Sequence, residues 1–392
     1  MSREIVIVAA KRNPMGGFQG ALSALSAPEL GAQAIKGVLD AAGLSADKVD
    51  EVYMGCVLPA GLGQAPARQA ALSAGLLEST PCTTVNKVCG SGMKTVMMAA
   101  DQLKAGHDGV YVAGGMESMS NAPYMLDKAR AGYRMGHQKV LDHMFLDGLE
   151  DAYDKNAMGV HAQRTADEFS LTREAMDNFA IRSLSRANEA IANGWFKDEI
   201  SAVEVVTRKG TTLVADDEQP GQARPDKIPQ LRPAFAKDGT ITAANSSSIS
   251  DGASALLITT ADKAKALGLT PLAKIVDYSS HAQAPSTFTC APIGAVRKIL
   301  DRQGLTASDF DLVEVNEAFA MVTMLAMQEI GFTAEQTNIS GGACALGHPL
   351  GSSGSRIIVT LLHNLKRTGG KRGLATLCIG GGEGTAIMVE ML

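Results

Sequence analysis

The sequence predicts an α/β fold built from two related halves. Two observations lead to this expectation. Short β-rich runs alternate with helical patterns and glycine-rich turns, which is typical of layered α/β proteins. Two such blocks also recur in the same order near both ends of the chain. Of the 392 residues, 41 are glycine; this exceeds the usual ~7% and indicates tight turns or closely packed backbone.

Composition and charge exclude several classes of protein. Hydrophobic residues make up 45% and charged residues 20% of the chain, so wholesale disorder is excluded. The length suffices for roughly two or three domains. A net charge of −5 disfavours a nucleic-acid partner. No apolar run approaches the ~18 residues of a membrane helix, so no membrane is expected. The six cysteines are scattered and lack zinc spacing, which indicates reduced thiols, no metal and a cytoplasmic location.

The first elements already show the repeat. Residues 2–10 are apolar over too short a stretch for a signal peptide and predict a buried first strand. Residues 43–52 then match residues 304–313, with glycine, leucine, alanine, aspartate and valine in register. A helical pattern precedes each copy, and a β-rich run follows at 51–57 and at 312–315.

The second repeated block begins with a glycine-rich turn. The turn covers residues 86–92 in the first copy and 346–354 in the second. A glycine pair ends the strand that follows in the first copy, and three glycines end it in the second. Two matched blocks in one order indicate an internal duplication. The predicted elements are helix 93–105 and strand 109–113 in the first copy, and helix 355–366 and strand 373–378 in the second.

The segment between the copies, residues 118–248, differs from them in amino-acid composition. It is more charged and is broken by prolines. Its clearest pattern predicts an amphipathic helix at 172–195, with Thr172 as N-cap and Glu174 in the first turn. We expect this segment to form a lobe of its own. The apolar stripe of the helix, at spacings of three and four, is Met176, Ala180, Leu184, Ala187 and Ile191.

Cys89 and His348 occupy the two matching turns. A cysteine at a helix N-terminus meets free N–H groups and a partial positive charge, which favour the nucleophilic thiolate. A histidine is the natural group to take a proton from that thiol. If the copies are related by an approximate twofold axis, the two turns should meet. Alternatively, Cys89 is an inert buried cysteine and His348 a structural residue.

Cys378 ends the last strand of the second copy, directly before the glycine run. A tuned thiol can act as an acid or a base, and the backbone N–H of Gly380 or its neighbours can stabilise an oxyanion. Asn316 follows the strand 312–315, where its amide could orient a water or donate to an oxyanion. The alternatives are a core cysteine at a strand end and a structural cap.

Four blocks together resemble the signature motifs of the thiolases: residues 86–92, 316–319, 341–349 and 378–382. The similarity is greatest to thiolases that act on acetoacetyl-CoA. It implies duplicated halves in a five-layered α-β-α-β-α arrangement with an inserted loop domain. The implied domains are 1–118 completed by about 249–268, the inserted 119–248, and 269–392.

By this resemblance, the reaction is a ping-pong Claisen exchange between two acetyl-CoA and acetoacetyl-CoA plus CoA. Cys89 takes the acyl group as a thioester, and His348 takes the thiol proton. Cys378 handles the α-proton of the second acetyl-CoA. One oxyanion hole is formed by His348 and a water held by Asn316, and the other by the N–H groups of Cys89 and Gly380. CoA thioesters are substrates, and no cofactor or metal is implied.

The inserted lobe is implied to cover coenzyme A, with Ser247 bonding the pantetheine. Two departures concern the acyl pocket: Ala157 stands where many short-chain relatives have histidine, and Phe288 where some have methionine. The loop 133–144 resembles the loop that joins relatives into tetramers, so a homotetramer, a dimer of dimers, is expected. The other binding residues implied are Leu231, Ala243, Ala318, Phe319 and Met158, with Arg224 near the adenine and phosphates.

Three alternatives stay open. A 3-ketoacyl-CoA thiolase of fatty acid β-oxidation would accept longer acyl chains. A β-ketoacyl carrier-protein synthase would need two histidines, or histidine and asparagine, and Cys378 speaks against it. A non-catalytic acyl-CoA carrier would have lost part of the set of Cys89, His348 and Cys378, yet all are present.

Overall fold

A single mixed sheet organises the protein in the computed structural model, which describes residues 3–208 and 210–392. The sheet has the strand order β12-β13-β14-β11-β1-β10-β5-β3-β4, and β2 pairs with β10 outside this path. Its strands are β1 (Ile5–Arg12), β2 (Gly16–Gly17), β3 (Glu51–Gly55), β4 (Cys82–Val85), β5 (Tyr111–Ser118), β10 (Ser250–Thr260), β11 (Ala273–Ala282), β12 (Leu312–Val315), β13 (Arg372–Ile379) and β14 (Glu383–Met391).

The two halves of the sheet repeat one topology outward from its centre. There, β1 and β11 pair antiparallel over Val6–Lys274 and Ile7–Ala273. On one side follow β10, β5 and β3, and on the other β14, β13 and β12. In each half the outer pair is parallel, β3 with β5 and β12 with β13. The predicted duplication is therefore a structural one.

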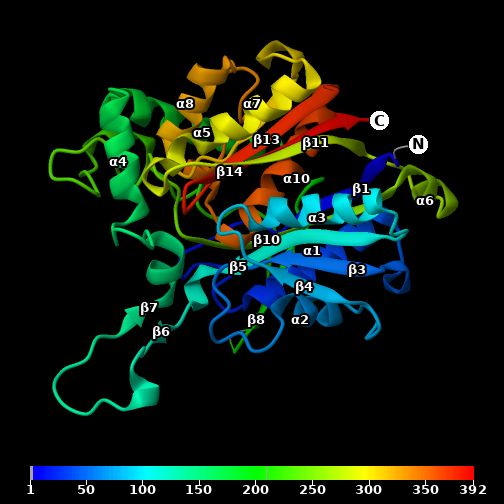
Figure 1. Cartoon of the computed structure of the whole chain (residues 1–392), viewed down its shortest axis with the longest axis horizontal. Coiled ribbons are helices and arrows are strands. Elements are labelled where there is room, and N and C mark those ends of the chain that lie inside the picture. The colour runs from blue at the N-terminus through cyan, green and yellow to red at the C-terminus, as the bar shows by residue number, and fades with distance from the viewer. Residues whose placement is uncertain (1–2, 209) are drawn as a thin grey trace.

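Helices complete the layers seen in Figure 1. Two central helices, α3 and α10, pack on one another between the half-sheets. Helices α1 and α2 cover the outer face of the first half-sheet, while α7 and α8 cover that of the second. The α/β layered fold is thus confirmed. The helix bounds are α1 (Ala27–Ala42), α2 (Pro66–Ser73), α3 (Ser91–Ala105), α6 (Ala261–Ala266), α7 (Ala291–Gln303), α8 (Ala320–Ile330), α9 (Ala343–Leu346) and α10 (Leu350–Thr368).

Matching glycines end matching helices. Gly43 (φ 62°) follows α1 and Gly304 (φ 64°) follows α7, each in the left-handed conformation that costs glycine little. Both belong to the first repeated block of the sequence. A short 3₁₀ turn and a strand follow in each case, at Ala46–Lys48 and Ala307–Asp309 before β3 and β12. Both copies of the first predicted block are confirmed.

The glycine pair Gly114-Gly115 lies inside β5, and the prediction that it ends the strand is wrong. Ladder pairing with β3 and β10 on both sides continues the strand. A Cβ on Gly115 would lie 1.9 Å from the carbonyl oxygen of Gly351, at the start of α10. The glycine therefore serves the close approach of α10 to the sheet, a tertiary contact that no local pattern reports.

The inserted segment contains two small hairpins and two helices. Its longest helix, α5, is N-capped by Thr172, whose side chain accepts a hydrogen bond from the N–H of Ala175; the prediction for 172–195 is confirmed within three residues at its end. The loop between β6 and β7 extends away from the body in Figure 1. The elements are β6 (Tyr124–Met125), β7 (Leu141–Asp142), α4 (Met158–Glu168), α5 (Arg173–Ala192), β8 (Val203–Thr207) and β9 (Gly210–Val214).

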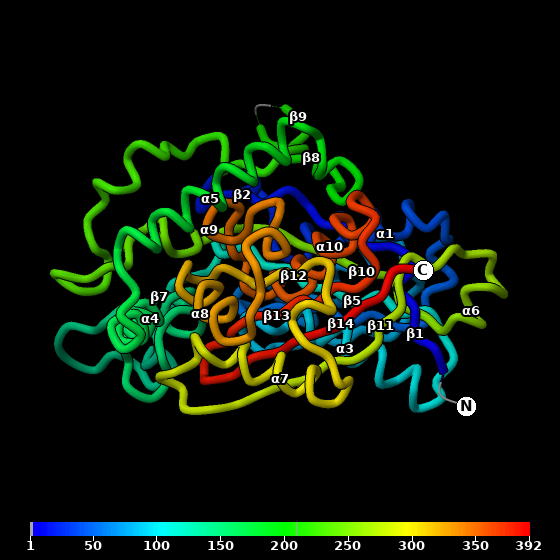
Figure 2. Tube along the Cα trace, turned by 90° about the horizontal axis from the view of Figure 1, so that it is seen from above, coloured from blue at the N-terminus to red at the C-terminus, as the bar shows by residue number. Residues whose placement is uncertain are grey.

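Seen from above in Figure 2, α4 and α6 lie at opposite ends of the molecule, and the C-terminus lies near α6.

The domain boundaries expected from the sequence stay a prediction. None of the helices in the described part of the chain combines the length and apolar character needed to cross a membrane.

Candidate active site

A cavity of about 320 Å³ opens where both repeated turns, the β13–β14 turn and the inserted segment converge. The repeat accounts for this convergence, because it places one turn before α3 and the other before α10, and these helices pack together. Most residues singled out from the sequence lie on its wall. Those are Cys89, Met158, Ser247, Phe288, Ala318, Phe319, His348, Cys378 and Gly380.

A rigid turn carries Cys89. Asn86 accepts a hydrogen bond from the N–H of Val88 at 3.0 Å, and Ser91 accepts one from the N–H of Lys87 at 2.8 Å. Val88 adopts φ 46°, a conformation that is unfavourable for a β-branched residue. Such an outlier persists only where its surroundings enforce it. The turn therefore holds the Cys89 side chain in one place against the cavity.

The thiol of Cys89 is a weaker acid than its position before α3 predicts. Burial raises its pKa to about 11, although hydrogen bonds from the N–H of Gly380 and from its own backbone lower it. Desolvation thus outweighs the helix N-terminus. The expected stable thiolate is not the resting form, so attack by this sulfur requires a base. The N–H of Gly380 already points at the sulfur, where an oxyanion hole would need it.

His348 has the character of that base. Its Nδ1 lies 2.5 Å from the hydroxyl oxygen of Ser353, and that hydroxyl donates to the carbonyl of Pro349. Nδ1 therefore carries the proton and donates to Ser353, while Nε2 is an acceptor. Nε2 is buried and has no partner within the described structure. Burial, assisted by Arg356, lowers the pKa of His348 to about 3, which keeps the imidazole neutral.

Cys378 faces the same cavity from the end of β13. Burial raises its pKa well above the ordinary value, and nearby Cys89 raises it further. Both residues line the same cavity. The turn that follows uses glycine for its shape, since Gly381 and Gly382 have φ 89° and 91°. The third turn thus brings a second thiol opposite the first.

Asn316 lies behind His348 and does not reach the cavity wall. It is fully buried, and its amide nitrogen is 3.5 Å from Nδ1 of His348. Its amide oxygen accepts from Arg356 at 3.3 Å. Asn316 therefore lies beside the imidazole, and its expected role in holding a water stays a prediction.

One part of the cavity wall is aromatic. Phe319 packs edge-on against Phe288 and Phe235, with ring centroids 6.5 and 6.3 Å apart. Ala157, just before α4, lines the same space. Ser247 is held by its own N–H, which donates to the carbonyl of Ala318 at 2.9 Å.

Three predicted CoA residues lie outside the cavity. Ala243 and Arg224 are exposed, and Leu231 is partly buried after a 3₁₀ turn, where its carbonyl accepts from Arg173 at 2.9 Å. Their expected contacts with the outer part of coenzyme A stay predictions, because the cavity extends only along the inner wall.

The sequence analysis missed several residues of the cavity wall. For Gly159 there was a signal, because a glycine inside a helical pattern indicates a close approach of another group; a Cβ there would lie 2.3 Å from the ring of Phe235. The others gain their role only through tertiary packing. The missed residues are Met144, Phe145, Gly148, Leu149, Gly159, Phe235, Ser246, Ile249 and Leu350.

Glu117 on β5 connects the loop after β3 to the turn that follows His348. Its carboxylate accepts from the N–H groups of Val57, Leu58 and Gly351 at 3.0, 3.1 and 2.8 Å. Burial raises its pKa to about 7, and its charge in turn raises the pKa of Cys89. This carboxylate therefore ties the loop after β3 to the first turn of α10.

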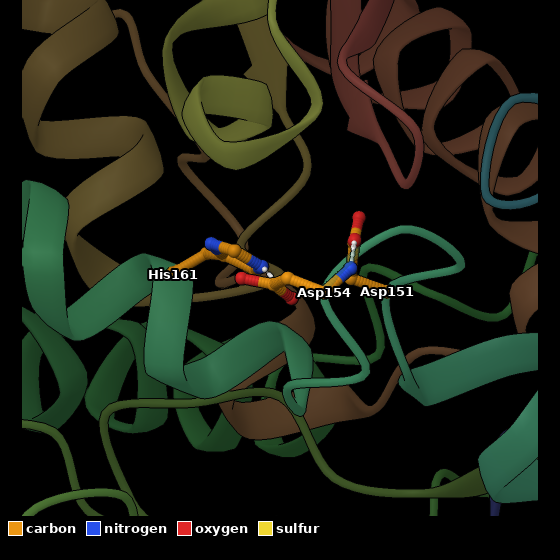
Figure 3. Close-up of side chains that lie close together, drawn as sticks. All are labelled: Asp151, Asp154 and His161. Atoms are coloured by element: carbon orange, nitrogen blue, oxygen red, sulfur yellow. Dashed lines mark hydrogen bonds and ion pairs between the residues drawn. The ribbon is translucent and has the colours of Figure 1, made fainter.

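Asp151, Asp154 and His161 lie together at the base of α4 (Figure 3). Each has a structural partner. Asp154 accepts from His161 at 3.1 Å and from Arg164 at 3.3 Å, and Asp151 accepts from the N–H groups of Tyr153 and Asp154. Because Arg164 already supplies the cation, we interpret this cluster as the support of the loop that carries Ala157.

Comparisons with known proteins agree over the whole chain. The family models for the thiolase N-terminal domain and the thiolase C-terminal domain match residues 5–262 and 269–391. The chain is 49% identical to an acetyl-CoA acetyltransferase of Pseudomonas aeruginosa, with 98% of each chain covered. It is 48% identical to one of Escherichia coli over the full length of both.

The fold is also that of a solved thiolase. The Acat5 thiolase from Ascaris suum, crystallised in complex with coenzyme A, superimposes with a TM-score of 0.94 at 38% identity, over the whole of both chains. With its duplicated sheet, two thiols and an imidazole around one cavity, and these matches over its full length, the chain belongs to the thiolase family.

Proposed function

We infer that this thiolase is an acetyl-CoA C-acetyltransferase, which condenses two acetyl-CoA to acetoacetyl-CoA and CoA or runs the reverse thiolysis. One observation carries the inference: Cys89, His348 and Cys378 surround a single cavity, each on a separate turn. The relatives named acetyl-CoA acetyltransferase support the substrate. CoA thioesters enter as substrates, and none of the proposed steps uses a cofactor or a metal.

In the first half-reaction, the Cys89 sulfur attacks the thioester carbonyl of acetyl-CoA. Nε2 of His348 accepts the thiol proton, which the raised pKa of Cys89 makes necessary. The carbonyl oxygen becomes an oxyanion, and the N–H groups of Cys89 and Gly380 stabilise it, with each donor worth ~3 kcal/mol. Collapse breaks the bond to CoA, whose sulfur takes a proton from the Cys378 thiol, while His348 keeps the proton of Cys89; Cys378 is left as the thiolate. The product is acetyl-Cys89.

In the second half-reaction, a new acetyl-CoA occupies the cavity. The thiolate of Cys378 removes a proton from its methyl group, and the enolate oxygen is stabilised beside His348 and Asn316. The carbanion carbon attacks the acetyl carbonyl of Cys89, and the carbon–sulfur bond breaks. Acetoacetyl-CoA leaves, the Cys89 sulfur takes back the proton held by His348, and Cys378 keeps the proton taken from the methyl group, so both thiols are restored. Two thiols thus divide the work between acyl transfer and proton transfer.

The aromatic wall supports a short acyl chain. Phe288 is buried against Phe319 and closes the acyl side of the cavity. Ala157 leaves more room than a histidine would. Because one methylene changes discrimination by ~1–3 kcal/mol, the four-carbon substrate should be preferred over the five-carbon one by no more than ~10²-fold.

Thiolysis of a chain-length series of 3-ketoacyl-CoA substrates tests this function. We expect acetoacetyl-CoA to have the highest kcat/KM. Ala157→His should reduce activity on the five-carbon substrate more than on the four-carbon one, and Phe288→Ala should do the opposite. Equal rates on chains of about ten carbons would instead support the broader 3-ketoacyl-CoA thiolase. Absence of any turnover would support the non-catalytic carrier.

The assembly is proposed to be a homotetramer, acting in the cytoplasm in the metabolism of fatty acids. The loop between β6 and β7 supports the assembly, because it exposes Met135 and Val140, at 85% and 58%, and projects from the body (Figure 1). Exposed apolar residues on a projecting loop favour a protein partner. Light scattering should give four times the mass of the chain, and a single-chain mass would contradict the proposal.

A further inference from the structure

Arg356 is a fully buried cation on α10, two turns beyond His348. Its pairing is incomplete. One nitrogen is 4.0 Å from the carboxylate of Glu314, another donates to Asn316 at 3.3 Å, and Nε and NH1 meet no acceptor within the described structure. Burial without full pairing is costly for a guanidinium. Such a residue calls for an explanation beyond folding.

Arg12, a second fully buried arginine, shows what a structural role looks like. It forms a 2.5 Å ion pair with Glu199 and a two-pronged one with Asp217 at 2.7 and 2.9 Å. All of its charge is thus matched by nearby carboxylates. Arg356, in contrast, directs a donor at the amide that touches the candidate base. The complete pairing of Arg12 is typical of a structural residue, whereas the incomplete pairing of Arg356 indicates a different role.

The orientation of Asn316 depends on this contact. A guanidinium can only donate, so the amide oxygen must face Arg356 and the amide nitrogen must face His348. The nitrogen therefore lies at 3.5 Å from Nδ1 of the imidazole; because Nδ1 carries a proton and donates to Ser353, this is a close approach of two donors and not a hydrogen bond. Turned the other way, the amide would place its nitrogen against the guanidinium and its oxygen beside the imidazole. Arg356 thus decides which polar atom borders the candidate base.

We propose that Arg356 is a positioning residue of this thiolase: it holds the Asn316 amide with its nitrogen toward His348 and places a fixed positive charge behind the imidazole. The proposal rests on the proposed function of His348 as the base. A cation behind the ring disfavours a second positive charge on it, in agreement with the direction in which Arg356 shifts the pKa of His348.

The charges around this pair are few. Glu314 on β12, Glu317, Glu199 and Arg12 act on Arg356, while Cys89 and Cys378 share the cavity with His348. Burial raises the pKa of Glu314 to about 8, which weakens it as a counter-ion near neutral pH. Arg356 therefore has carboxylates in its surroundings but no close ion pair with Glu314, whose oxygen lies at 4.0 Å.

Arg356→Met tests the proposal by two separate measurements. Histidine-labelled NMR, with His348→Asn for assignment, should show the pKa of His348 raised by at least about one unit, because the cation is gone. The kcat for acetoacetyl-CoA thiolysis should fall about 10²-fold, because Asn316 loses the donor that orients its amide. KM should change less than about threefold. The NMR measurement needs no turnover, so an inactive wild type would defeat the proposed function without deciding this proposal.

Two further variants separate positioning from folding. Arg186 donates, among the described residues, to the backbone carbonyls of residues 334, 337 and 338, and it is not among the groups that shift the pKa of His348; Arg186→Met should therefore lower Tm and leave the His348 titration in place. Arg356→Lys keeps the charge and should leave that titration unmoved while kcat falls about tenfold. An unchanged titration in Arg356→Met, or a wild-type kcat in Arg356→Lys, would overturn the proposal. If Arg356→Met does not fold, the lysine variant decides.

Discussion

The turns before α3 and α10 share one origin in the repeat and one place in the fold, yet they carry opposite chemistry. The first turn is held by the side chains of Asn86 and Ser91, and burial raises the pKa of the Cys89 thiol to about 11. In the second, His348 contacts Ser353 of the following helix, and burial lowers the pKa of the imidazole to about 3. Burial therefore favours the neutral form of both the Cys89 thiol and the His348 imidazole.

The comparison shows that burial keeps both the proton donor, the Cys89 thiol, and the proton acceptor, the His348 imidazole, in their neutral forms. Desolvation disfavours the charged form of either group, so the resting pair is a neutral thiol and a neutral imidazole. Neither group reacts until a substrate carbonyl offers the new charge a place to develop, beside Gly380. Duplication supplied the symmetrical scaffold, and different side chains on the two helices divided the roles. The predictions below test this division.

Removing the nucleophile should have the largest effect. Cys89→Ser should lower thiolysis by at least ~10⁴-fold, because the hydroxyl is a far poorer nucleophile than the thiol. Mass spectrometry after incubation with acetyl-CoA should show no acetylated peptide at residue 89. Cys82→Ser is the control, since Cys82 lies on the edge strand β4, where its thiol donates to the carbonyl of Thr80, and it does not line the cavity. An acetyl group on another residue of the wild type would defeat the assignment.

Removing the second thiol should separate the two half-reactions. Cys378→Ala should still form acetyl-Cys89, but condensation should fall by about 10³-fold, because no group remains to move the α-proton. Exchange of the methyl hydrogens of acetyl-CoA with deuterated water, followed by NMR, should stop. Exchange at the wild-type rate would exclude Cys378 from the proton transfer.

The scaffold shared by both turns can be tested without touching the catalytic groups. A Cβ on Gly92 would lie 2.5 Å from the Ser355 hydroxyl and 2.8 Å from its backbone nitrogen, so Gly92→Ala should force α3 and α10 apart. We expect a loss of about 1–3 kcal/mol in stability, visible as a lower Tm. Gly221→Ala is the matched control, because its Cβ would meet nothing within 4 Å. Equal Tm values would contradict the close approach.

The smallest effect should be a change in pH dependence. The pKa of Glu117 is raised to about 7 when folded, so the folded protein holds a proton that the unfolded chain releases. Its contribution to stability is full below the ordinary carboxyl pKa and is lost as the pH rises through about 7. The Tm of Glu117→Gln should therefore fall less steeply between about pH 5 and pH 7.5 than that of the wild type. Glu335→Gln, at an exposed glutamate, should retain the wild-type slope.

Much of the architecture was readable from local patterns. The repeat placed Cys89 and His348 in matching turns, and their meeting followed once α3 and α10 were packed on each other. The glycines that end α1 and α7 could also be predicted, since a left-handed residue at a helix end is a local requirement. The prediction for the pair Gly114-Gly115 was wrong for the opposite reason, because the backbones of β10 and α10, which are far away in the sequence, lie against Gly114 and Gly115 respectively.

The sequence by itself determined the alternation of strands and helices, the duplication and the identity of the reactive groups, because each depends on residues close together in the chain. Only the tertiary structure decided the protonation of those groups and the neighbours that set it. Arg356 reaches Asn316 and His348 through the packing of α10 against β12, and Glu117 meets three N–H groups from two distant segments. A pKa depends on the water excluded around a group, and that exclusion exists only when the layers have packed.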